Sequence, residues 1–380
     1  MSGSDVSKTE LSGSEDKDFV VVGRPTARVV LPSADDPETH DDGSEYELAR
    51  EEAGENEEDA LEDFPDDTDE LELVHARISS LAPLRLQRFA GHLKRLCLRQ
   101  NAISFLDPEV FHRLVGLEEL DLYDNKIKDV DDALDRLSSL TTLDLSFNLL
   151  RSIPDGLAHL PSLKTVYFVQ DRISKITGLG ASVALTSLEL GGNKIRRIEG
   201  LDALVNLEEL WLGKNKLSKL EQNLENLTKL RILSLQSNRI TKIENLEKLE
   251  NLEELYLSHN GVEKIEGLEQ NKKLKTLDLG TNFIPEIENV SHLTSLEELW
   301  LNGNKIPDLR ALDPQLKHLA SLETIYLEGN PCQVSEGAIY RRKIKLSLPQ
   351  VKQIDATWVP FPLPHLSFQS DWVPRFAQPL

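Results

Sequence analysis

The residue types that carry out catalysis or bind metals do not occur in this 380-residue sequence at the spacings those roles require. The two cysteines, Cys97 and Cys332, are too few for a disulfide framework or a cysteine-only zinc site. The nine histidines show no ligand spacing, and no serine lies in a strand-to-helix elbow. Gly178 and Gly180 resemble the start of a dinucleotide loop, but Val183 replaces the next glycine. We therefore predict a chain that is not an enzyme and holds no metal or cofactor.

Aromatic and acidic side chains recur every twenty-odd residues, each between two apolar residues of an L-x-L pattern, and their chemistry suits protein binding. The residues in this position are Cys97, Asp121, Asp144, Tyr167, Glu189, Trp211, Ser234, Tyr256, Asp278, Trp300 and Tyr326. A row beside it adds Glu119, Glu209, Glu254 and Glu298. Exposed Trp and Tyr are frequent interface anchors, and carboxylates pair with basic groups. We predict a protein partner with a basic, partly apolar convex surface. The alternative is that Trp211 packs sideways on Glu189 and Ser234 and only stabilises the sheet.

The elements that must position these side chains follow from a repeat. Residues 207–217, 252–262 and 296–306 all read L-x-x-L-x-L-x-x-N-x-aliphatic, which is a leucine-rich repeat. The same frame places Asn101, Asn125, Asn148, Asp171, Asn193, Asn215, Asn238, Asn260, Asn282, Asn304 and Asn330 at intervals of 22 to 26 residues. A degenerate first copy has Ala76 at the asparagine position, so we count twelve copies.

Each copy predicts a short strand followed by a turn. The L-x-L core alternates with period two, so Leu210 and Leu212 point inward and Trp211 points outward. The asparagine side chain both donates and accepts, so stacked asparagines should form an internal ladder, with a weaker rung at Asp171. A 22-residue copy leaves little room for a full α-helix, so we expect 3₁₀ or irregular turns on the convex side. Stacking buries the leucines between neighbours and curves the array.

The predicted fold is an α/β leucine-rich-repeat solenoid with a curved parallel sheet on its concave side, about twelve repeats and a C-terminal cap. We assign residues 1–68 to an acidic disordered tail, 69–335 to the repeat array, 336–359 to the cap and 360–380 to a Pro/aromatic tail. The C-terminal tail either folds back on the cap or acts as a polyproline-type ligand.

Charge and hydropathy exclude several classes of function. The net charge is −22, but residues 1–70 hold 24 acidic and 5 basic residues, so the remaining body is nearly neutral. We therefore expect no binding to nucleic acid, which needs a cationic excess. We find no signal peptide and no apolar run of membrane-spanning length, so we expect an intracellular protein without membrane contact.

Several segments make the chain resemble a known family. Residues 209–216, 236–239, 255–261, 340–343 and 353–357 are similar to the leucine-rich-repeat regulatory subunit of protein phosphatase 1, regulatory subunit seven, and the likeness covers roughly residues 70–359. The resemblance implies a scaffold whose concave face holds the catalytic subunit of protein phosphatase 1. The residues we predict to bind the partner are Asp144, Tyr167, Glu189, Trp211, Tyr256, Asp278, Glu298, Trp300 and Tyr326.

The same resemblance implies further properties. It links the chain to maturation of the phosphatase together with a small inhibitor protein, to mitotic chromosome segregation, and to the nucleus and cytoplasm. We expect a monomer when the chain is alone. The competing hypothesis is another nuclear leucine-rich-repeat adaptor, spliceosomal or chromatin-associated, that binds a basic protein.

One match to a docking motif is predicted to be accidental. Residues 164–168 fit the short linear motif by which many partners of this phosphatase dock. Val166 and Phe168, however, occupy the two inward strand positions of a repeat, so they should be buried.

Overall fold

The computed structural model describes residues 60–358, which belong to one compact unit. The described residues form a single sheet of fourteen strands in chain order. The strands are β1 (Glu70–Glu72), β2 (Arg95–Cys97), β3 (Glu119–Asp121), β4 (Thr142–Asp144), β5 (Thr165–Tyr167), β6 (Ser187–Glu189), β7 (Glu209–Trp211), β8 (Ile232–Ser234), β9 (Glu254–Tyr256), β10 (Thr276–Asp278), β11 (Glu298–Trp300), β12 (Thr324–Tyr326), β13 (Gln353–Ile354) and β14 (Thr357–Trp358). Strands β1 to β13 are parallel, and β14 pairs antiparallel with β13.

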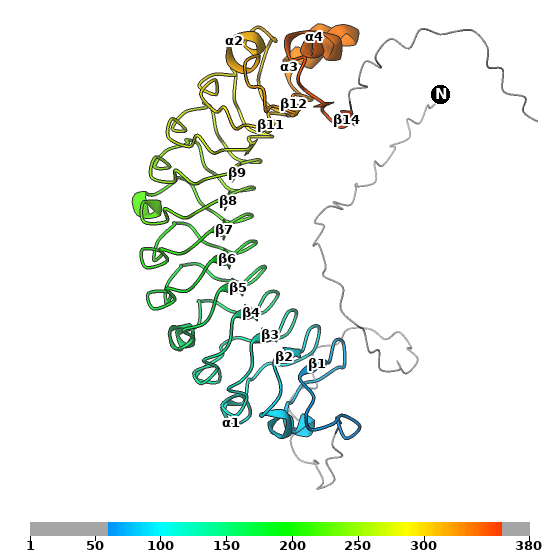
Figure 1. The fold of residues 1–380 in the computed structure, drawn as a ribbon, viewed down its shortest axis with the longest axis vertical. Coiled ribbons are helices and arrows are strands. Elements are labelled where there is room, and N and C mark those ends of the chain that lie inside the picture. Colours follow the sequence, from blue (N-terminus) through cyan, green and yellow to red (C-terminus); the bar gives the residue numbers. More distant parts are fainter. Residues whose placement is uncertain (1–59, 359–380) are drawn as a thin grey trace, which may run out of the picture. The chain divides into compact units, whose positions relative to one another are not determined.

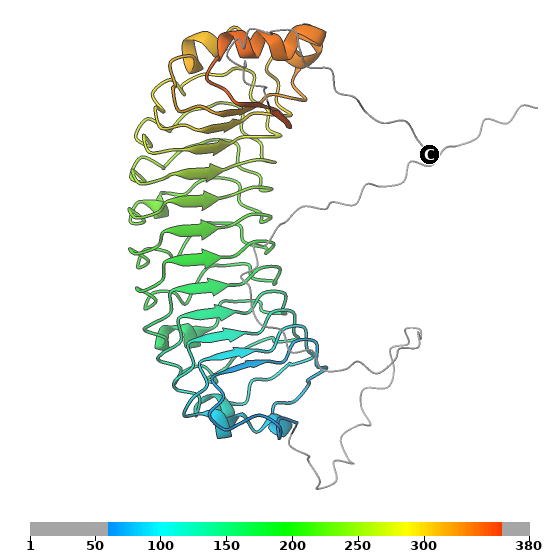
Figure 2. The ribbon, with the colours of Figure 1, turned by 45° about the vertical axis from the view of Figure 1, so that its right-hand side comes forward.

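The strands stack as a curved ladder, with the sheet lining the inside of the arc (Figure 1). Neighbouring strands pair without a register shift, as in β6 and β7, where Leu188 lies opposite Leu210 and Glu189 opposite Trp211. The second view shows the strands lying side by side along the length of the array (Figure 2). The predicted solenoid with a parallel sheet on its concave side is therefore confirmed.

The convex side carries short turns, as the repeat length predicts. The described elements between β1 and β12 are η1 (Ala82–Leu84), η2 (Leu86–Phe89), α1 (Pro108–Phe111), η3 (Asp155–His159), η4 (Gln222–Leu224) and α2 (Leu312–Leu316). The other convex segments are turns and bends. Each convex turn is wider than the distance of about 4.8 Å between strands, so the stack bends toward the sheet.

The core is a column of aliphatic side chains that runs the length of the array. Within one copy, Leu207, Leu210, Leu212, Leu217 and Leu220 are all essentially inaccessible to solvent. Each buried leucine contributes about 1.5–3 kcal/mol relative to an exposed one, but only when the next copy covers it. Stability therefore arises at the interfaces between copies.

The segment that fits a phosphatase-docking motif lies inside this column. Val166 and Phe168 have no exposed surface, and Val166 is the central residue of β5. The prediction that the match is accidental is confirmed, because a partner cannot reach either side chain while the repeat is folded.

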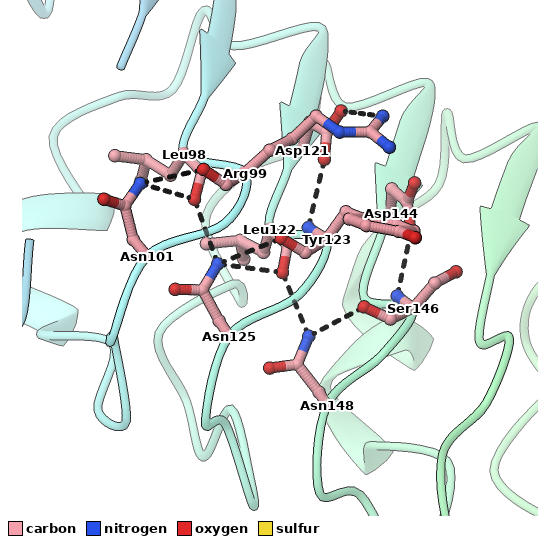
Figure 3. Close-up of polar contacts among 10 residues, drawn as sticks. All are labelled: Leu98, Arg99, Asn101, Asp121, Leu122, Tyr123, Asn125, Asp144, Ser146 and Asn148. Carbon is pink, nitrogen blue, oxygen red and sulfur yellow. Dashed lines mark hydrogen bonds and ion pairs between the residues drawn. The ribbon is translucent and has the colours of Figure 1, made fainter. Parts of the chain in front are cut away.

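An asparagine ladder closes each turn, and Figure 3 shows three of its rungs. The Asn125 amide donates to the carbonyls of Leu98 (2.9 Å) and Leu122 (3.1 Å), and its oxygen accepts the Ile103 N–H (3.0 Å). The preceding residue, Asp124, has a φ of 55°, a left-handed conformation unfavourable for residues other than glycine. The side-chain hydrogen bonds offset this cost and join each copy to the one before it.

The two ends of the array are covered by different segments. At the start, Leu61 is buried, and Arg88 donates to the carbonyls of Leu61 and Phe64. Residues 60–68, which the sequence analysis placed in the tail, are thus part of the fold, because Leu61 covers the first turn. The rest of that tail and residues 359–380 lie outside the described residues.

The C-terminal cover is helical. It consists of α3 (Pro331–Glu336), η5 (Gly337–Ile339), α4 (Tyr340–Ser347) and the β13–β14 pair. Tyr340, Ile344, Leu348, Val351 and Ile354 bury their side chains against the last copies. No helix among the described residues is both long and apolar enough to cross a membrane.

Candidate protein-binding site on the concave sheet

The strand register brings the predicted binding residues together on the face of the sheet opposite the core. In every strand from β1 to β12 the central residue is buried, so the residues on either side of it point to the concave face. The last residues of the strands are direct neighbours, from Asp144 opposite Tyr167 in β4 and β5 to Trp300 opposite Tyr326 in β11 and β12. Glu298 is the first residue of β11 and lies in the neighbouring row.

Aromatic side chains pair with one another in the C-terminal half of this row. The rings of Trp300 and Tyr326 lie 5.3 Å apart at 55°. The rings of Trp211 and Tyr256 lie 6.3 Å apart at 21°, although β8 separates their strands. They stack across Ser234, which retains 3% of its exposure. Trp211 therefore contributes to the sheet surface and also presents a ring that is half-buried and still accessible to a partner.

Hydrogen bonds hold three of these aromatic side chains in place. The Tyr256 hydroxyl donates to a Glu254 carboxylate oxygen (2.7 Å), and the Trp300 indole nitrogen donates to Glu298 (3.1 Å). Gln353 donates to the Tyr326 hydroxyl (2.6 Å). Because these rings are already ordered, a partner that binds them loses little side-chain entropy.

We expected Asp278 to project from the concave surface, but its side chain is buried. It lies in the row between Tyr256 and Trp300, but only 3% of it is exposed. One carboxylate oxygen accepts the Gly280 N–H (2.9 Å), and burial raises the pKa of the carboxyl group. Asp278 is therefore not an exposed charge, although its neighbours in the row are Tyr256 and Trp300.

The N-terminal half of the row is acidic. Asp121, Asp144 and Glu189 are half-buried, and in each case burial raises the pKa of the carboxyl group. Nearby carboxylates add to the rise for Asp144 and Glu189. Asp121 accepts from Arg99 (3.0 Å), and Asp144 accepts the Ser146 N–H (2.8 Å), as Figure 3 shows. A basic group from a partner would relieve this repulsion and find its acceptors already positioned.

A cation–aromatic cluster that we did not predict lies beside this acidic half. The Arg99 guanidinium lies 4.1 Å from the ring centre of Tyr123, and the Tyr123 ring lies 4.8 Å from that of Phe147. Phe147 keeps 40% of its exposure. These residues follow the second inward leucine of their copies, and period-two alternation beyond that leucine would have pointed to Tyr123.

The described side chains of the row offer the contacts of a binding surface. The described residues include no group of three metal-ligating side chains. Cys97 lies in the row, but burial raises the pKa of its thiol to about 11, so it is not a nucleophile at neutral pH. The remaining chemistry is apolar contact, hydrogen bonding and ion pairing.

Comparisons with known proteins agree with the repeat assignment. One leucine-rich-repeat family model matches residues 69–127 and 91–150, and a second, for two copies of the repeat, matches overlapping stretches from 183 to 314. Among solved structures, an internalin from Listeria monocytogenes aligns with a TM-score of 0.61 at 24% identity, covering 76% of this chain and 87% of that one. A leucine-rich-repeat protein from Leptospira interrogans aligns with a TM-score of 0.57 at 23% identity, covering 77% and 96%. These likenesses concern the fold.

Two curated relatives have informative names. Protein phosphatase 1 regulatory subunit SDS22 of Schizosaccharomyces pombe is 51% identical over 72 residues, which are 18% of this chain and 20% of the relative. The protein of the same name from Saccharomyces cerevisiae is 48% identical over 69 residues, again 18% and 20%. The matched stretch is a fifth of each relative's length, and over it the resemblance to regulatory subunits of this phosphatase is confirmed. Both relatives are named as regulatory subunits, in agreement with the prediction of a non-catalytic scaffold. The repeat spacing, the aligned sheet and the matching repeat models together show that the chain belongs to the leucine-rich-repeat family.

Proposed function

We propose that this chain is a non-catalytic regulatory scaffold that binds the catalytic subunit of protein phosphatase 1 through its concave face. The observation that carries the proposal is the row from Asp144 to Tyr326, aligned on one face in a chain similar to named phosphatase-1 regulatory subunits. The aromatic half supplies apolar anchors and the acidic half supplies acceptors for basic groups.

The consequences of binding belong to the same proposal. A curved scaffold that covers part of a phosphatase controls which substrates and metals reach it, and so its maturation, activity and location. We include a small phosphatase inhibitor protein as a third component, a role in mitotic chromosome segregation, and residence in nucleus and cytoplasm. The similarity to regulatory subunits supports this assignment.

The test is the affinity of the full chain for the purified catalytic subunit, measured by titration calorimetry. Trp300→Ala and Tyr326→Ala each remove an ordered ring from the concave row. We expect each substitution to weaken binding by about 30-fold, since interface anchors contribute about 2 kcal/mol. Phe283→Ala is the matched control, because Phe283 is 55% exposed but lies outside the row. An unchanged affinity in the Trp300→Ala, Tyr326→Ala double variant, with its fold intact, contradicts the proposal.

The acidic half favours one second candidate, an adaptor for a different basic protein. Asp121 helps to raise the pKa of Asp144, and Asp144 that of Glu189, an arrangement that suits any partner offering a row of cations. Affinity capture from nuclear and cytoplasmic extracts separates the two candidates. If a spliceosomal or chromatin protein is retained at stoichiometric levels and the phosphatase is not, the second candidate replaces the first.

A further inference from the structure

A strip of basic side chains runs along the edge of the array where the chain leaves the strands. The residues after the ladder asparagine follow the same order from copy to copy. The first lies at the surface, the second is a buried aliphatic residue, the third and fourth are exposed, and the fifth is buried again. Around the buried Ile195 and Ile198, for example, the exposed residues are Lys194, Arg196 and Arg197. The local turn therefore directs three side chains per copy into solvent.

Backbone hydrogen bonds hold these positions in columns. The Lys194 N–H donates to the carbonyl of Ile173 in the preceding copy (2.8 Å), and the Lys216 N–H donates to that of Ile195 (2.8 Å). The Lys126 N–H makes the same bond at the start of the strip (2.8 Å). Equivalent side chains are thus spaced by one copy, and their charges add along the edge.

Between residues 126 and 264 these columns hold thirteen basic residues against two acidic ones, Asp129 and Glu263. Four of the cations have acidic partners, as with Arg197 and Lys219, which both lie 3.3 Å from Glu221. The other two paired cations are Lys242 and Lys264. The remaining nine form no ion pair with any residue that the structure describes, and we name them the basic edge. They are Lys126, Lys128, Arg151, Arg172, Lys175, Lys194, Arg196, Lys216 and Arg239.

The same chain contains a segment of opposite charge. Residues 44–59 hold eight acidic residues and one basic residue, and the described fold begins directly after them. Fully extended, a segment of this length reaches about 50 Å. The basic edge spans six copies, which is about 25 Å at the sheet spacing. The segment is therefore long enough to lie along the whole edge.

We propose that the basic edge binds the chain's own acidic segment, residues 44–59. The tether makes the contact intramolecular, with an effective concentration in the millimolar range. The unpaired cations of the edge then meet carboxylates, and other acidic ligands reach the edge only by displacing the segment. The basic edge is separate from the concave row. The proposed contact therefore does not depend on whether the partner of the concave row is a phosphatase.

Zero-length carbodiimide crosslinking of the full chain tests the contact, because it joins only carboxylates and amines that touch. Mass spectrometry should find residues 44–59 joined to Lys126, Lys194 and Lys216 within single molecules. These links should disappear in about 0.5 M salt, which screens exposed charges. Lys248 and Lys272, exposed in segments that lead into strands, are the matched controls. Equal linkage to these two lysines overturns the proposal.

A second measurement separates the segment from other polyanions. In one variant, every Asp and Glu of residues 44–59 becomes Asn or Gln in the full chain. This variant should bind a labelled synthetic 44–59 peptide at least about tenfold more tightly than the native chain, whose own segment competes. Changing Lys126, Arg172, Lys194 and Lys216 to Gln in that variant should abolish the gain. Equal peptide affinity of the native and neutralised chains, or tight binding of single-stranded RNA but not of the peptide, refutes the proposal.

Discussion

At residue 171 the asparagine ladder carries a carboxyl group, and this single change alters the electrostatics of the rung. One Asp171 oxygen accepts the Leu150 N–H (3.1 Å), as an asparagine oxygen would. The second oxygen is buried and has no hydrogen-bond partner among the described residues. In the Asn148 and Asn193 rungs, the side-chain amide nitrogen takes the position of this second oxygen and donates hydrogen bonds to backbone carbonyls. Burial raises the pKa of Asp171 to about 7, because a carboxyl group removed from water is more stable protonated than charged.

We predict that Asp171→Asn stabilises the protein and that the gain grows with pH. The folded-state pKa lies above the ordinary value of 3.8, so the native chain loses stability as pH rises from about 4 to 7. That pKa difference corresponds to at most ~4 kcal/mol. Denaturant unfolding at pH 5 and pH 8 measures the gain, which should be larger at pH 8. Asp155→Asn, at an exposed position, is the control, and a gain independent of pH contradicts the explanation.

An intact rung gives the complementary prediction. Asn282 donates to Leu257 and Leu279 (both 3.0 Å), and accepts the Val262 N–H (3.0 Å). Asn282→Ala leaves these buried groups without partners, so it should reduce the free energy of unfolding by about 3 kcal/mol. Asn206 makes two exposed hydrogen bonds, one to the Val183 carbonyl and one from Lys229, and Asn206→Ala should cost less than about 1 kcal/mol. Similar losses at both sites in chemical denaturation would show that the ladder is not a source of stability.

Among the elements, the β12–β13 junction shows how a solenoid ends. No further copy pairs with the end of β12, and the Asp355 carboxylate supplies the missing acceptor. It accepts the N–H groups of Leu327 (2.9 Å) and Glu328 (3.0 Å), and Arg341 lies 3.6 Å from its other oxygen. In the preceding copy, the equivalent Leu301 N–H donates to a carbonyl of the next strand, so the Asp355 side chain replaces a strand carbonyl at the end of the array.

We predict that Asp355→Ala loosens this end of the array first. Two buried N–H groups lose their acceptor, at a cost of about 2–4 kcal/mol. Hydrogen exchange should accelerate in β12 and the cap, while β3 to β6 keep their native rates. Asp355→Asn retains an acceptor oxygen and should show a smaller effect. Uniform acceleration over all strands would contradict a local role for the cap.

Across the whole molecule, stability and function should respond differently to the number of copies. Each strand pairs only with its neighbours in the chain, so a complete copy can be removed without leaving an unpaired strand. Deleting residues 239–260 joins two asparagine rungs and removes β9 with Tyr256. The concave row then lacks one aromatic ring, and the distance between its two halves shortens by one strand.

We predict that this deletion variant folds but binds its partner at least about 100-fold more weakly, since misplaced anchors cannot reach their pockets together. Circular dichroism and cooperative unfolding report the fold, and calorimetry with the catalytic subunit reports binding. An eleven-residue deletion, 239–249, breaks the period and should unfold. Native-like affinity in the 22-residue deletion would mean that the concave row does not act as a unit.

Much of the architecture could be predicted because each copy repeats a local rule. The L-x-L alternation placed Leu210 and Leu212 inside and Trp211 on the concave face, and the structure confirms this. Val166 and Phe168 were correctly placed in the core by the same rule. A period of about 22 residues also implies an aligned row, because parallel neighbours without a register shift keep equivalent positions opposite each other.

The exposure and pairing of the row's side chains depended on the tertiary structure. Asp278 is buried although it lies in the outward row, and Trp211 stacks on Tyr256 across a strand that carries a small serine. These outcomes depend on side-chain sizes in copies that lie 22 or 44 residues apart, and no window of local sequence contains them. The sequence determined the repeat and its inside and outside, because both follow from backbone periodicity. Only the folded array decided which outward side chains stay accessible, because stacking brings distant copies within about 5 Å of each other.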